Sequence, residues 1–252
     1  MMTGRQITDS PDVDSSTEPP AVPKEVPPAG PSIGPSTGPL PGPASRPPNL
    51  MFDTTPWKQT KTKIEIPRNG WVYLGCPKSN AVCYTDFHPE HQDGLVVKVH
   101  GATMTRDVGT GTKETVAGWA AYWGGPGNEW NFSIEHKTIR TNWVATLEAC
   151  KYALELFASG QDTFIPPLKT LVLKTCNKHL RDAFEREIPR LLREKWKSKY
   201  RVTYRDRLLD LYKCIETIKE GYGHTSVKLW FVEQEADIKE AVDLLDPILT
   251  RA

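Results

Sequence analysis

Residues 94–102 read GLVVKVHGA, and residues 141–149 read TNWVATLEA. The first stretch opens with a continuous apolar run at residues 95–99, which is typical of a strand buried on both faces of a sheet. The second stretch opens a pattern of apolar residues at helical spacing that ends before Gly160. We therefore predict a buried strand that is followed along the chain by a well-defined helix at residues 142–157.

Similar patterns predict the other elements of the fold. A turn cluster at residues 124–128 joins two of the strands as a hairpin. A helical connection makes the strand at residues 168–173 parallel to the first strand. The additional strands are predicted at residues 116–123, 130–136, 168–173 and 227–232, and the additional helices at residues 177–186, 188–197, 205–220 and 236–249.

The two opening stretches resemble the ribonuclease H family, in which they read Asp-Gly-Ala and Thr-Asn-x-x-Ala-Glu-Leu-x-Ala. Residues 70–75 (GWVYLG) and 84–94 (YTDFHPEHQDG) are similar to the lead-in of fungal members of that family. The resemblance implies an α/β fold of the ribonuclease H-like type. We expect a mixed five-stranded sheet with helices on both faces.

The catalytic positions that the resemblance implies have lost most of their carboxylates. His100 stands at the Asp of the first strand, Thr146 at the Glu of the first helix, and Cys176 at the Asp after the fourth strand. In the last helix the resemblance leaves Asp243, or Asp237 in a shifted register. Glu148 cannot replace the carboxylate at Thr146, because two residues along a helix point to opposite faces.

Ribonuclease H chemistry uses two divalent metal ions that clamp the attacking and leaving oxygens. Mg²⁺ and Mn²⁺ need several carboxylate oxygens, so one remaining carboxylate is too few. We therefore predict a non-catalytic domain that binds nucleic acid or protein, with no cofactor and no metal site. Two alternatives stay open. One is an active ribonuclease H that cuts RNA in RNA/DNA hybrids, with Mg²⁺ or Mn²⁺ held by recruited carboxylates such as Asp107 or Glu114. The other is an accessory scaffold without nucleic acid.

A cationic stretch at residues 186–201 interleaves basic and aromatic side chains, which can contact phosphates and stack on bases. A solvated helical face with charge pairs is the alternative interpretation. The candidate nucleic-acid-binding residues in this stretch are Arg190, Arg193, Lys195, Trp196, Lys197 and Lys199.

Composition divides the chain into three parts. Most of the 22 prolines lie in residues 1–50, which have almost no aromatic residues and are predicted to be disordered. This Pro-rich arm is a candidate docking segment for a protein partner. Residues 51–93 are predicted to be an extended lead-in that packs on the domain, and residues 94–252 to be the ribonuclease H-like domain itself.

The net charge and the cysteines bear on the class of ligand and on the cellular compartment. The net charge of +1 gives no overall signature of a nucleic-acid binder. The N-terminus carries no apolar stretch, so we expect neither a secretory signal nor a membrane anchor. Five cysteines without a Cys-x-x-Cys pair favour reduced thiols in the cytoplasm or nucleus.

Two further chemistries are considered for the cysteines and histidines. Cys76, Cys83 and the pair His88 and His91 could share a structural zinc ion, although their spacing lacks a zinc knuckle. Cys176 and His100 would lie close together in the implied fold and could form a nucleophile and base. The sequence offers no third residue to orient such a pair.

Overall fold

The computed structural model describes residues 48–77, 93–107, 111–164, 167–197, 204–221 and 224–250. The chain divides into two units, Met1–Gly42 and Pro43–Ala252, and all the described residues belong to the second. Apart from residues 48–50, the predicted Pro-rich region lies outside the described residues. Cys83, His88, His91 and Lys199 also lie outside them.

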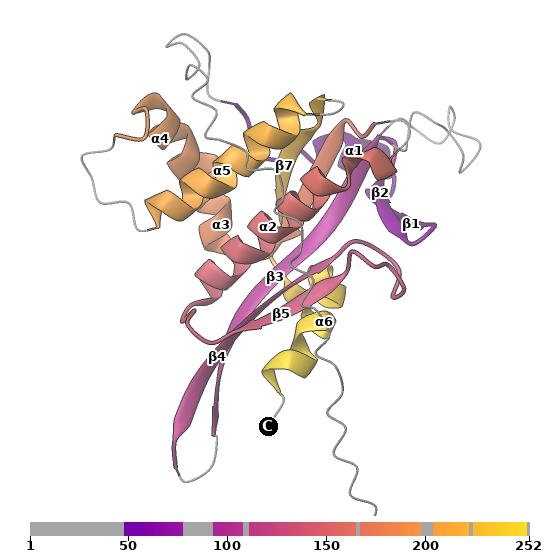
Figure 1. Cartoon of the computed structure of the whole chain (residues 1–252). Coiled ribbons are helices and arrows are strands. Elements are labelled where there is room, and N and C mark those ends of the chain that lie inside the picture. The colour runs from indigo at the N-terminus through magenta and orange to yellow at the C-terminus, as the bar shows by residue number, and fades with distance from the viewer. Residues whose placement is uncertain are drawn as a thin grey trace, which may run out of the picture. The chain divides into compact units, whose positions relative to one another are not determined.

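The described strands form one mixed sheet (Figure 1). Strands β5, β4 and β3 are neighbours and antiparallel, and β6 and β7 continue the sheet beyond β3 as parallel strands. The bounds of the strands are β1 Glu65–Arg68, β2 Trp71–Leu74, β3 Gly94–Asp107, β4 Lys113–Tyr122, β5 Phe132–His136, β6 Thr170–Thr175 and β7 Ser226–Phe231.

Strand β3 is the centre of the sheet. Its first six residues are buried, and the parallel pairing with β6 runs from Gly94 opposite Thr170 to Lys98 opposite Lys174. The predicted parallel orientation of these two strands is confirmed. The strand continues well beyond the predicted end at residue 99, because its second half keeps pairing with β4 as a solvent-exposed antiparallel ribbon.

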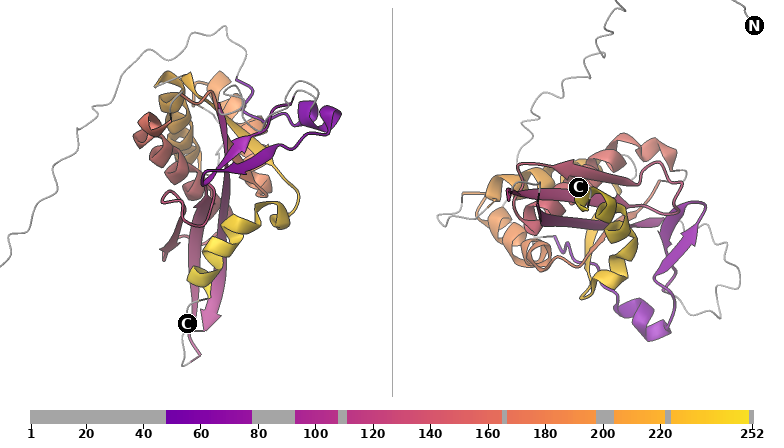
Figure 2. Two further views of the ribbon diagram at one scale, coloured as in Figure 1. Left: turned by 90° about the vertical axis from the view of Figure 1, so that its right-hand side faces the viewer. Right: turned by 90° about the horizontal axis from the view of Figure 1, so that it is seen from below.

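Helices cover both faces of the sheet, as predicted (Figure 2). α2 and α5 pack over one face, with Leu147, Phe157 and Leu211 in the main core. α6 packs on the other face, where Leu245 and Val116 of β4 belong to one buried hydrophobic cluster. The bounds of the helices are α1 Thr55–Thr60, α2 Asn142–Ser159, the 3-10 helix η2 Gln161–Thr163, α3 Lys178–Asp182, the π-helix η3 Ala183–Glu187, α4 Ile188–Arg193, α5 Arg205–Glu220, the 3-10 helix η5 Glu235–Ile238 and α6 Lys239–Leu249.

The described part of the lead-in joins the sheet. β1 and β2 form a hairpin, and Tyr73 of β2 pairs with Leu95 at the start of β3. These two strands extend the predicted five-stranded sheet to seven. Glu65 of β1 forms ion pairs with Lys98 of β3 and with Lys174 of β6, two lysines that are only 7% and 5% exposed. The hairpin is thus tied to the centre of the sheet by charge as well as by pairing.

No helix in the described ranges is both long enough and apolar enough to cross a membrane.

Candidate functional site

The implied catalytic positions meet in a cavity of about 420 Å³ beside the central strands. Its walls come from the middle of β3, the start of α2, the segment that leads from β6 into α3, and η5. The lining residues are His100, Gly101, Thr141, Asn142, Trp143, Thr146, Cys176, Asn177, Lys178, His179 and Glu235. The structure therefore brings together three of the four predicted positions, namely those of His100, Thr146 and Cys176.

A glycine positions α2 against β3 at the floor of this cavity. A Cβ atom at Gly101 would lie 2.2 Å from the backbone nitrogen of Thr146 and 2.3 Å from the carbonyl carbon of Ala145. No side chain fits in that space, so α2 approaches β3 at backbone contact. Thr141 caps the same helix by accepting a hydrogen bond from the Val144 N–H at 3.3 Å.

The Thr146 side chain is fully engaged within the fold. Its hydroxyl donates to the Asn142 carbonyl at 2.8 Å, with the Gly101 carbonyl at 3.3 Å, and accepts from the Asn177 amide at 3.0 Å. Only 1% of the residue is exposed. The carbonyl of the same Asn177 amide accepts from the Leu180 N–H at 3.1 Å and so caps α3. Thr146 and Asn177 thus serve as a polar brace between β3, α2 and α3.

Three other lining side chains face one another. The ligand atoms of His100, Cys176 and Glu235 all lie within 4.8 Å of one another. Burial lowers the pKa of the His100 imidazole, and the carboxylates of Glu235 and Asp246 oppose that shift. Burial raises the pKa of the Cys176 thiol, and the charge of Glu235 raises it further.

Asp243, the carboxylate predicted to survive, does not line the cavity. It lies on the exposed side of α6, where it pairs with Lys239 one turn earlier. Asp237 lines a different cavity, described below. The carboxylate that reaches the site is Glu235 of η5, which the sequence analysis did not single out. It belongs to a short 3-10 turn before the last helix, where no hydrophobic periodicity sets the register.

The other carboxylates considered in the sequence analysis do not line the cavity. Glu148 points away from the cavity, as its position in α2 predicts, and pairs with Arg207 of α5. Glu114 pairs with Arg106 at 3.4 Å on the exposed ribbon of β3 and β4. Asp107 ends β3 on the same ribbon.

The metal ions that the resemblance implies do not fit the donors present. Mg²⁺ and Mn²⁺ prefer several oxygen ligands, and two such ions need carboxylates from different parts of the fold. Among the described residues that line the cavity, Glu235 alone carries a carboxylate. The hydroxyl of Thr146 already forms hydrogen bonds with Asn142 and Asn177. The cavity therefore offers too few oxygen ligands to bind a pair of Mg²⁺ or Mn²⁺ ions.

A cysteine nucleophile also fits poorly. Reactive thiols need an environment that lowers their pKa, usually through neighbouring positive charge. At Cys176 burial and the neighbouring Glu235 act in the opposite direction. The site therefore holds a thiol that resists deprotonation.

The described part of the basic stretch begins at the end of η3 and continues through α4, which is labelled in Figure 1. Arg193, Lys195 and Lys197 are exposed, whereas Arg190 pairs with Glu187 at 2.5 Å. Trp196 is partly buried, with its ring 5.8 Å from that of Tyr212. Among the described candidates, Arg193, Lys195 and Lys197 are thus available to a ligand, while the indole of Trp196 contributes to the core.

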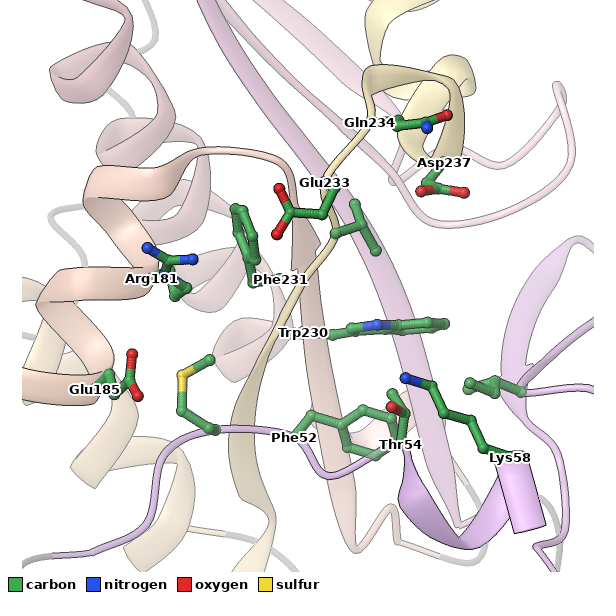
Figure 3. Close-up of a pocket in the computed structure, with 13 residues that line it drawn as sticks. Phe52, Thr54, Lys58, Arg181, Glu185, Trp230, Phe231, Glu233, Gln234 and Asp237 are labelled. Carbon is green, nitrogen blue, oxygen red and sulfur yellow. The ribbon is translucent and has the colours of Figure 1, made fainter. Parts of the chain in front are cut away.

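A second cavity of about 800 Å³ lies between β7 and the segment that precedes α1 (Figure 3). Trp230 and Phe52 form its aromatic wall, with ring centroids 5.7 Å apart. Arg181 lies over the Phe231 ring at 4.7 Å. Cationic and acidic side chains both line this cavity, so its charge favours no single ligand.

No family model and no curated protein matches the sequence. Among solved structures, the protease-reverse transcriptase of prototype foamy virus is 12% identical over 62% of this chain, with a TM-score of 0.45, and the match spans only 21% of that protein. The PFV RNase H domain is 13% identical over 61% of this chain and 90% of its own length, with a TM-score of 0.41. LC11-RNase H1, solved in complex with an RNA/DNA hybrid, is 16% identical over 62% of this chain and 99% of its own length, with a TM-score of 0.35.

The fold is ribonuclease H-like. The assignment depends on the observed strand order and directions: an antiparallel meander of β3, β4 and β5 followed by parallel β6 and β7, with helices on both faces. The predicted fold class is therefore confirmed.

Proposed function

We propose that this chain is a non-catalytic ribonuclease H-like domain that binds nucleic acid. The observation that carries the proposal is the set of side chains where the implied catalytic positions meet: an imidazole, a committed hydroxyl and a thiol occupy three of them. Such a cavity lacks the oxygen ligands that phosphodiester cleavage by two metal ions requires.

The groups around the cavity suit a nucleic-acid ligand. Lys178 and His179 are exposed at its rim, and Trp143 lies beside His179 with a centroid distance of 6.1 Å. A cation contacts phosphate and an aromatic ring stacks on a sugar or base. The exposed cations of the α4 end, Lys195 and Lys197, would add contacts further along a duplex.

The ligand class we propose is a duplex with A-form character, such as an RNA/DNA hybrid. Proteins recognise such duplexes mainly by shape and by backbone contacts, which need no metal ion. LC11-RNase H1, a protein of similar fold, is seen with an RNA/DNA hybrid. With it we propose a reducing cytoplasmic or nuclear setting, in which the thiols of Cys150, Cys176 and Cys214 would stay reduced.

Fluorescence anisotropy with labelled RNA/DNA hybrid, duplex RNA, duplex DNA and single strands tests the proposal. We expect the hybrid or duplex RNA to bind best, with affinity that falls as salt rises because phosphate contacts release counterions. Absence of binding to every probe at low salt would show that the domain has no nucleic-acid ligand.

Substitutions locate the interface. Lys178→Ala tests the cavity rim, and the triple variant Arg193→Ala, Lys195→Ala, Lys197→Ala tests the end of α4. Each lost phosphate contact lowers the salt slope by about one unit. Lys213→Ala is the matched control, because Lys213 is an exposed cation of α5 that pairs with Asp210 at 3.3 Å.

A scaffold without nucleic acid is the second candidate. The net charge of +1 favours it, since most nucleic-acid binders carry a clear basic excess. A pull-down from native extract with and without nuclease treatment separates the two. Partners that survive nuclease treatment support the scaffold.

A further inference from the structure

We propose that His100, Cys176 and Glu235 form a binding site for a single zinc ion. The site is distinct from a two-metal magnesium centre in both its donors and its metal. It does not depend on nucleic-acid binding, so either proposal can fail without the other.

The donors come from three separate parts of the fold. His100 is carried by β3, Cys176 follows the end of β6, and Glu235 belongs to η5 before the last helix. Parallel pairing of β3 with β6 fixes the first two elements side by side, and packing of η5 against both strands brings in the third. Nitrogen, sulfur and oxygen ligands thus converge through the tertiary fold.

The separations suit one ion. The three ligand atoms lie within 4.8 Å of one another. Around a tetrahedral zinc ion with bonds of about 2.0 to 2.3 Å, ligand atoms lie about 3.3 to 3.8 Å apart. Each separation therefore exceeds the tetrahedral value by at most about 1.5 Å, a difference that rotations of the three side chains would have to close.

The three side chains are also available. The imidazole of His100 and the carboxylate of Glu235 have no hydrogen-bond or ion-pair partner among the described residues. The neighbouring polar groups of Thr146 and Asn177 bond to each other and to backbone. The Cys176 thiol is hydrogen-bonded only to its own backbone among the described residues. The cavity therefore places all three donors beside a polar wall whose side chains already bond elsewhere.

Zinc is the cation that this donor set selects. A thiolate and an imidazole are poor ligands for Mg²⁺ and good ligands for Zn²⁺. On binding, the Cys176 thiol releases its proton to solvent and the thiolate forms a bond to the metal. Three protein ligands leave the fourth position of a tetrahedral ion open to the cavity, an arrangement that accommodates water.

Cobalt substitution tests the site directly. The full chain is stripped of metal with a chelator, kept reduced, and titrated with Co²⁺ while its absorption spectrum is recorded. We expect one equivalent to produce a thiolate-to-cobalt charge-transfer band in the near ultraviolet and the intense visible bands of four-coordinate cobalt. One equivalent of Zn²⁺ should bleach both, and excess Mg²⁺ should not.

Three variants identify the ligands, and a fourth serves as their control. Cys176→Ser should abolish the charge-transfer band, and His100→Ala and Glu235→Gln should each weaken cobalt binding by more than about 100-fold, since even outer-sphere changes cost 10- to 100-fold. Cys214→Ser is the matched control, because Cys214 is a free, partly buried cysteine on α5. Glu235→Gln keeps size and shape at an exposed position, so it remains informative if another variant fails to fold.

Three results would overturn the assignment. The first is the absence of a stoichiometric charge-transfer band in the wild-type chain. The second is a band that survives in Cys176→Ser and therefore reports another cysteine. The third is displacement of Co²⁺ by Mg²⁺ at comparable concentration. Thermal denaturation supplies a second readout, because Zn²⁺ should raise the melting temperature of the wild-type chain and of Cys214→Ser but not that of Glu235→Gln.

Discussion

Replacement of Gly101 by alanine tests the contact that builds the site. The added Cβ would lie 2.2 Å from the Thr146 backbone nitrogen and 2.3 Å from the Ala145 carbonyl carbon. An ordinary contact begins near 3.4 Å, so α2 must move away from β3 by about 1 Å. Backbone atoms of a packed helix cannot rotate aside as a flexible side chain does.

The cost should therefore lie at the upper end of what overpacking produces, about 3 kcal/mol. For a folded domain of this size that corresponds to a melting temperature lower by roughly 6 to 12 °C. The same movement stretches the contact of the Thr146 hydroxyl with the Gly101 carbonyl. Equilibrium urea unfolding, followed by circular dichroism, measures the change in free energy.

Gly127→Ala is the matched control, because a Cβ at Gly127 has nothing within 4 Å. We expect the control to unfold within about 0.5 kcal/mol of the wild type, as surface substitutions usually do. A Gly101→Ala chain as stable as the control would refute the close approach of α2 to β3, and with it the described geometry of the cavity.

Three further predictions follow from the polar contacts. Glu65→Gln should lower the free energy of unfolding by about 3 kcal/mol in urea titrations, because it removes the counter-charge of the nearly buried Lys174 and leaves Lys98 with Glu240 alone; an unchanged midpoint would contradict that role. Asn177→Ala should cost about 1 to 2 kcal/mol, since it removes both the α3 cap and the bond to Thr146, and a shift no larger than that of Gly127→Ala would count against the brace. Burial alone would raise the pKa of Glu240, but hydrogen bonds from Lys98 lower it below 4.5. The ionised Glu240 therefore stabilises the fold above pH 4.5, and this contribution is lost as the pH falls through the lower pKa of the folded state. Glu240→Gln should flatten the dependence of the free energy of unfolding on pH in this range. Parallel pH profiles for the variant and the wild type would disprove the linkage.

The sequence predicts best where a local pattern decides the structure. α5 begins and ends at the predicted residues, because its apolar spacing is regular and Gly221 follows it. α2 exceeds its predicted end by two residues. The second half of β3 was harder to predict, because exposed residues of the β3–β4 ribbon lack the apolar run that marks the buried half.

Long-range contacts explain what the sequence does not reveal. β2 joins the sheet where Tyr73 pairs with Leu95. No local sequence pattern predicts this pairing, because the two residues belong to separate segments of the chain. The choice of Glu235 over Asp243 depends on the 3-10 turn of η5, whose packing against β3 and β6 is a tertiary effect. His100, Thr146 and Cys176 could be placed together in advance because the resemblance supplied the topology.

We propose that this ribonuclease H-like domain binds nucleic acid without cutting it. The most direct measurement is gel analysis of an end-labelled RNA/DNA hybrid incubated with saturating protein and either Mg²⁺ or Mn²⁺. We expect the RNA strand to stay intact while fluorescence anisotropy of the same sample shows that the hybrid is bound. Metal-dependent cleavage products that appear with the wild-type chain and vanish in Glu235→Gln would contradict it.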